Sequence, residues 1–122
     1  MHKFKELIVW QKARILVKEI YVLTSFYPSS EKFGIISQIQ RAVISIPANI
    51  AEGSGRGSNK DFSRFIDMAL ASAFELETEI ILSYDLSFIS ILRICIPVLL
   101  KVKVLIISRS DVFVLKEVTE RN

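Results

Sequence analysis

The segment at residues 37–56, SQIQRAVISIPANIAEGSGR, constrains the fold more than any other part of this chain. Apolar residues recur in it and just before it at alternating steps of three and four, which places them on one face of a helix. They are Ile36, Ile39, Val43, Ile46 and Ile50. Such a face packs against neighbouring helices, so the segment predicts a helical bundle.

Pro47 lies inside this pattern, where a proline removes a backbone donor and clashes with the carbonyl four residues earlier. We therefore expect a helix over residues 31–52 that is kinked near Pro47, with Ser45 bonding the freed backbone groups. Gly53 then begins a glycine-rich exit that ends the helix. Asn49 and Glu52 are expected to tie the kink to the turn that follows.

Two more helices are predicted on either side. Residues 7–26 carry apolar side chains at helical spacing, and Pro28 ends this helix because a proline disfavours helical geometry in the residue before it. Residues 59–87 carry a second heptad stripe, preceded by Ser58 and Asp61 in the spacing of an N-terminal capping box. This stripe comprises Phe62, Ile66, Ala69, Ala73, Leu76 and Ile80, and Asp67, Glu75 and Glu79 lie off it.

A fourth helix over residues 89–118 is harder to derive, because residues 89–107 are apolar almost all round and Pro97 interrupts them. A membrane span needs about 18 apolar residues with few charges, and Lys101 and Lys103 fall inside the candidate. A strand over residues 102–107 would have no partner strand. We favour a helix buried in an oligomer, with a stripe of Leu92, Cys95, Leu99, Val102 and Ile106.

Composition agrees with one packed domain. Of the 122 residues, 51% are hydrophobic, and the net charge is only +3. We therefore predict a single domain over residues 1–122: an all-α, antiparallel, up-and-down four-helix bundle. The charge is uneven, because residues 1–60 carry nine Lys/Arg against four Asp/Glu, whereas residues 61–88 carry one against six. The first two helices are thus the expected basic surface.

The chain resembles the family of proteins encoded in intervening sequences of bacterial 23S ribosomal RNA genes. The segments that carry this resemblance lie within residues 4–89: FKELIVWQKA, the Tyr27-Pro28 turn followed by Glu31, QIQRAVISIPANIAEG and ALASAFELETEI. The resemblance implies an antiparallel four-helix bundle that assembles into ring-shaped homopentamers. A related branch serves reverse transcriptases of diversity-generating retroelements as an accessory protein. Members of the family usually end in a charged amphipathic helix, whereas residues 91–122 are apolar and β-branched; a shifted reading frame or real divergence would explain this.

Catalytic arrangements fail for lack of parts, because the only histidine is His2, near the terminus. We expect no enzyme activity, no cofactor and no metal, since the Glu-x-x-His ligands of di-iron bundles are absent. Cys95 is a single cysteine, which suits a reducing cytoplasm, and no secretion signal is recognised. Arg41 is expected to pair with Glu75 or Glu79 and so to lock the second helix to the third.

The charged residues leave two functions open. Lys12, Arg14 and Lys18 on the first helix, with Arg56 and Lys60 near the glycine-rich turn, are candidate contacts to an RNA or DNA backbone. The turn itself lacks the spacing and preceding strand of a nucleotide-binding loop. The chain is therefore interpreted as a non-catalytic homo-oligomer that binds nucleic acid through charge. The alternative is an adaptor for another protein, such as a reverse transcriptase.

Overall fold

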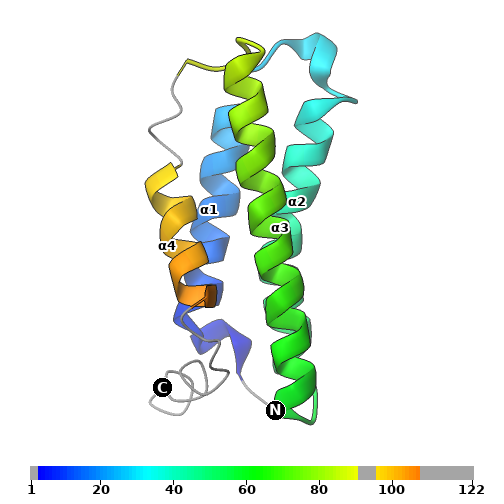
Figure 1. The fold of residues 1–122 in the computed structure, drawn as a ribbon, viewed down its shortest axis with the longest axis vertical. Coiled ribbons are helices and arrows are strands. Elements are labelled where there is room, and N and C mark those ends of the chain that lie inside the picture. The colour runs from blue at the N-terminus through cyan, green and yellow to red at the C-terminus, as the bar shows by residue number, and fades with distance from the viewer. Residues whose placement is uncertain (1–2, 91–95, 108–122) are drawn as a thin grey trace.

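Four α-helices lie side by side as a bundle (Figure 1). The computed structural model describes residues 3–90 and 96–107 of the chain. The helices are α1 (Ile8–Thr24), α2 (Ile35–Ser54), α3 (Asn59–Asp85) and α4 (Ile96–Ile107), with short 3-10 helices η1 (Phe4–Glu6) and η2 (Ser29–Glu31). The all-α prediction is confirmed over these residues, which include no strand.

The expected heptad stripes form the core. Every member of the α3 stripe is buried, and so are Ile39, Val43, Ile46 and Ile50 of α2. Helix α1 contributes Val9, Ala13, Leu16, Ile20 and Leu23 to the same cluster. Burial of these side chains is the main contribution to the stability of the fold. Each large apolar side chain that leaves water stabilises the folded state by about 1.5–3 kcal/mol.

Several helix boundaries differ from the expected ones. Helix α1 ends at Thr24 instead of residue 26, and α2 continues to Ser54 instead of ending at residue 52. Helix α2 starts at Ile35 instead of residue 31, because η2 and a turn occupy the residues after Pro28. Helix α3 ends at Asp85, and Ser87 then adopts a left-handed conformation with φ 63°. The amide of Phe88 donates to the carbonyl of Ser83 at 2.8 Å, which closes the helix end as a left-handed cap does.

Helices α2 and α3 pack tightly against each other at Gly53. Gly53 lies inside α2, although the sequence suggested that it would end the helix. A Cβ built on Gly53 would lie 2.6 Å from Cβ of Phe65 and 3.0 Å from Cδ1 of Phe62. Any side chain here would therefore collide with α3. Gly55 and Gly57 have no such neighbour, since the nearest atom to a Cβ on Gly55 is a carbonyl oxygen at 3.5 Å.

Helix α4 begins at Ile96, so Pro97 occupies its first turn, where the missing amide costs no intrahelical bond. Leu99 and Val102 are buried as expected, and Lys103 Nζ lies 2.9 Å from Glu77 Oε2 of α3. Residues 102–107 are helical, which excludes the strand alternative. The remainder of the predicted fourth helix, residues 91–95 and 108–118, lies outside the described residues, as does most of the segment behind the reading-frame hypothesis.

Candidate nucleic-acid interface

Two of the three candidate cations on α1 share one exposed face. Arg14 and Lys18 are four residues apart and both exposed, whereas Lys12 is half-buried and lies two residues before Arg14, on a different side of the helix. The guanidinium carbon of Arg14 lies 5.7 Å from the ring centroid of Trp10. Trp10 in turn packs edge-on against Phe4, at 5.2 Å between ring centroids. The aromatic contact orients Arg14 beside the start of the helix.

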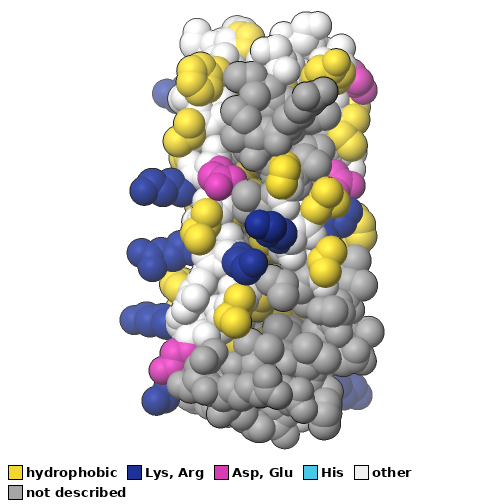
Figure 2. Space-filling model, turned by 90° about the vertical axis from the view of Figure 1, so that its left-hand side faces the viewer, with side chains coloured by type: hydrophobic (Ala, Val, Ile, Leu, Met, Phe, Trp, Pro, Cys, Tyr) yellow, Lys and Arg dark blue, Asp and Glu magenta, His cyan; other side chains and the backbone are white. Residues whose placement is uncertain are grey.

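Lys and Arg side chains project in a column from one edge of the bundle in Figure 2. Hydrophobic side chains lie among the charged ones on the viewed face. A column of exposed cations suits a phosphate backbone, because backbone contacts need accessible positive charge without a shaped pocket.

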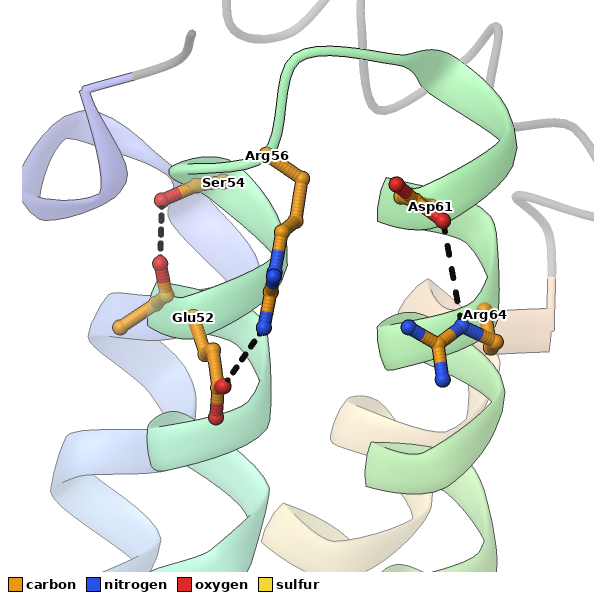
Figure 3. A network of polar contacts seen from close by, with 6 residues as sticks. Glu52, Ser54, Arg56, Asp61 and Arg64 are labelled. Atoms are coloured by element: carbon orange, nitrogen blue, oxygen red, sulfur yellow. Dashed lines mark hydrogen bonds and ion pairs between the residues drawn. The ribbon is translucent and has the colours of Figure 1, made fainter.

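The α2–α3 turn holds a second group of cations (Figure 3). Arg56 Nη2 lies 2.9 Å from Glu52 Oε1, and Arg64 Nε lies 3.9 Å from Asp61 Oδ1. Both guanidinium groups also lie over the ring of Phe65, at 4.7 Å for Arg56 and 5.0 Å for Arg64. Two cations therefore share one aromatic ring, and each is oriented by a carboxylate.

These ion pairs are partly open to solvent. The side chains of Arg56 and Arg64 are 43% and 63% exposed, so each pair stabilises the fold by less than about 1 kcal/mol. Lys60 in the first turn of α3 is also exposed. Ser58 Oγ accepts the amide of Asp61 at 3.1 Å, half of the expected capping box; the Asp61 carboxylate faces Arg64. Arg64 precedes Phe65 directly in the chain, but no sequence pattern predicts that Arg56 lies over the same ring.

The expected bond between Arg41 and a carboxylate is not formed. Arg41 is exposed, and no ion pair within 4.0 Å joins it to an acidic group among the described residues. Arg41 and Glu75 do line the same open groove between α2 and α3, of about 550 Å³. The structure thus brings the two residues to one place without pairing them.

Polar side chains near Pro47 form hydrogen bonds with backbone carbonyl groups of α2. The Ser45 hydroxyl donates to the carbonyl of Ala42 at 2.6 Å, rather than to that of Val43, which the proline leaves free. The side-chain Nδ2 of Asn49 donates to the backbone carbonyl of Ser45 at 2.8 Å. Asn49 thus stays within α2, and Glu52 reaches the following turn through Arg56, so the two residues act separately.

Glu79 is a buried carboxyl that the heptad pattern did not reveal. It is only 6% exposed, and its Oε1 has no hydrogen-bond partner. Burial, together with the nearby charge of Glu75, raises the pKa of Glu79 from 4.5 to about 7. Ser72, Glu75 and Glu79 recur at steps of three and four, so they share a face, and the first two line the groove against α2.

No cluster of three or more metal-ligating side chains occurs within residues 3–90 and 96–107. None of the helices in these ranges is long and apolar enough to cross a membrane.

A comparison with known protein families finds a match that covers most of the chain. The sequence model of a family described as 23S rRNA-intervening sequence protein matches residues 5–94, which is most of the chain. No curated protein matches it. The matched region contains α1, α2 and α3 and ends before α4 begins at Ile96, so it confirms the resemblance carried by the first three helices.

Proposed function

The chain belongs to the 23S rRNA-intervening sequence protein family, and from this premise we propose that it is a non-catalytic homo-oligomer that binds RNA or DNA through exposed cations. The observation that carries this proposal is the exposed pair Arg14 and Lys18 on α1. Arg56 and Lys60 add positive charge at the α2–α3 turn. Phosphates attract these groups without regard to base sequence, so the mechanism is electrostatic scaffolding in the cytoplasm.

The proposed architecture is the antiparallel, up-and-down bundle, with α2 bent at Pro47. The four-residue connection between α2 and α3 supports alternating directions, because so short a link joins antiparallel neighbours. Pro47 inside α2 supports the bend, because it leaves one carbonyl without its helical donor.

Exposed apolar residues on α1 support self-association. Ile8, Ile15 and Val22 follow one another at seven-residue steps and are all exposed. A second copy that covered this stripe would remove apolar surface from water, and a closed ring would repeat the basic face around its axis. By family resemblance the ring is a pentamer.

We expect Ile15→Glu to abolish assembly, because it would place a charge at the centre of this stripe. Light scattering should give a discrete oligomer for the unchanged protein and a monomer for the variant. Asn59→Glu, which changes an exposed residue at the start of α3, is the control and should retain the oligomer. A monomeric unchanged protein, or an oligomeric Ile15→Glu, would contradict the proposal.

Binding to RNA should weaken steeply with salt. For the double variant Arg14→Gln and Lys18→Gln we expect the slope of log affinity against log salt to fall by about 1 per lost phosphate contact. Fluorescence anisotropy between roughly 50 and 200 mM salt measures this slope. Lys32→Gln, which removes an exposed cation outside the two candidate groups, should leave the slope unchanged. Tight binding whose affinity does not change with salt concentration would contradict the electrostatic mechanism.

A second candidate function, an adaptor for a protein such as a reverse transcriptase, has one observation in its favour. Phe26 and Phe33, in the connection between α1 and α2, are 74% and 91% exposed. Large exposed aromatic side chains are typical centres of protein interfaces. Co-purification with an enzyme encoded nearby, lost in Phe33→Ser, would favour the adaptor over nucleic-acid binding.

A further inference from the structure

An open apolar hollow of about 450 Å³ lies between the N-terminal 3-10 helix η1 and the C-terminal end of α2. Phe4, Ala51 and Gly55 are among the residues that line it. The Ser54 hydroxyl at its edge is already occupied, since it donates to the carbonyl of Ala51 at 2.7 Å. The hollow therefore offers contact to an apolar or aromatic group rather than to a strongly polar one.

Two lysines line this hollow, and two arginines belong to the adjoining α2–α3 turn and the first turns of α3. Lys3 and Lys5 line it and are exposed, and Arg56 follows Gly55 directly in the chain. Arg64 lies near Arg56, because the guanidinium groups of both residues lie over the ring of Phe65. Glu6 also lines the hollow, and Glu52 and Asp61 face the two arginines. The cations therefore outnumber the carboxylates here by four to three, or by five to three when the exposed Lys60 is included.

We propose that this end of the bundle binds unpaired nucleotides of single-stranded RNA or DNA, with a base in the hollow and phosphates at Arg56 and Arg64. The proposal deepens the proposed function and rests on it. An apolar hollow bordered by cations has the two components of single-strand recognition, namely a surface for the face of a base and charge for the backbone.

The two arginines are prepared for this role by their surroundings. The ring of Phe65 and the carboxylates of Glu52 and Asp61 already order both guanidinium groups, so less side-chain freedom is lost when a phosphate binds. Arg56 uses only Nη2 for Glu52, which leaves other N–H donors of its planar group for a phosphate. The exposed carboxylate pairs are weak enough for a phosphate to replace them.

The hollow supplies the preference for unpaired strands. In a duplex each base is stacked between its neighbours, so its face is hidden, and the duplex offers only its phosphates and groove edges. A splayed base in a single strand can enter the space beside Phe4 and Ala51. Contact of a base with an aromatic surface contributes roughly fivefold or more to affinity. Duplexes would be left with the electrostatic contribution alone.

The test compares a 12-nucleotide single strand, as RNA and as DNA, with a duplex of the same sequence, by fluorescence anisotropy at one salt concentration. The variant is Ala51→Leu, which fills the hollow without changing charge, and the control is Ala48→Leu at an exposed position of the same helix. We expect the unchanged protein and the control to prefer the single strand by about fivefold or more. In Ala51→Leu this preference should vanish while duplex affinity persists.

The double variant Arg56→Gln and Arg64→Gln provides a second readout that leaves the hollow intact. It should weaken binding of the single strand and lower its salt slope, whereas it should preserve the preference for the single strand over the duplex. Equal affinity of the unchanged protein for single strand and duplex, or an unchanged preference in Ala51→Leu, overturns this inference and leaves electrostatic binding standing. No binding of either nucleic acid overturns the proposed function itself.

Discussion

Gly53→Ala is expected to lower the free energy of unfolding by about 2 kcal/mol, because the added methyl would collide with Phe62 and Phe65 of α3. A Cβ at this position lies 2.6 Å from Cβ of Phe65, an atom fixed by the α3 backbone. The two helices would have to separate, and overpacking of this kind costs roughly 1–3 kcal/mol or more. The higher helix propensity of alanine offsets only about 1 kcal/mol of this cost.

Gly55→Ala is the matched control, two residues further along the same chain. Its Cβ would meet only a carbonyl oxygen at 3.5 Å, and its φ of −84° suits any residue. Its stability should change by less than about 0.5 kcal/mol or increase slightly. Urea denaturation of both variants measures the difference. A Gly53→Ala protein as stable as the Gly55→Ala protein would show that α2 and α3 are not held at this distance.

Gly53 also shows where sequence reasoning stops. Heptad spacing predicted the buried faces of α2 and α3, because apolar periodicity is a property of one segment at a time. The contact between Gly53 and Phe65 depends on how two helices meet, and no pattern within α2 contains that information. The sequence therefore marked the glycine as a helix end, whereas it is an approach point inside the helix.

The candidate site divides in the same way. The exposure of Arg14 and Lys18 follows from helical spacing alone. The contact of Arg56 and Arg64 with Phe65, and the hollow beside Gly55, are each formed by residues from separate segments of the chain. A pattern within one segment therefore does not predict either feature. Arg41 is the converse case. The sequence predicts an ion pair of Arg41 with Glu75 or Glu79, whereas in the structure Arg41 and Glu75 share a groove without pairing.

The buried carboxyl of Glu79 should make the free energy of unfolding depend on pH. Its pKa is raised to about 7 in the folded protein, mainly because burial disfavours the charged carboxylate. Below the ordinary pKa of 4.5 the carboxyl is protonated in both folded and unfolded chains, and it contributes no pH dependence. Between 4.5 and about 7 the unfolded chain releases the proton while the folded chain retains it, so stability falls as the pH rises. Above about 7 the loss is complete and the contribution levels off.

Charged groups on the surrounding helices do not relieve this cost. Glu75, one turn away on α3, adds to the rise in pKa. On α2, Arg41 lies exposed in the groove with Glu75 rather than paired with Glu79. On α4, Lys103 pairs with Glu77, and Lys101 is exposed.

Glu79→Gln should therefore stabilise the protein at pH 8 and do so much less at pH 5. The substitution keeps the shape of the side chain but removes its titration, so at pH 8 it avoids a penalty of up to about 3 kcal/mol, the energy equivalent of the pKa shift. Urea denaturation at both pH values measures the change in the free energy of unfolding. The control is Glu75→Gln, at an exposed carboxyl one turn away, which should increase the stability at pH 8 by less. If the unchanged protein and Glu79→Gln lost the same stability between pH 5 and pH 8, the buried carboxyl would not be the group that titrates. A stabilised Glu79→Gln protein would instead show that α3 carries a destabilising carboxyl, whose ionisation loosens the bundle near neutral pH.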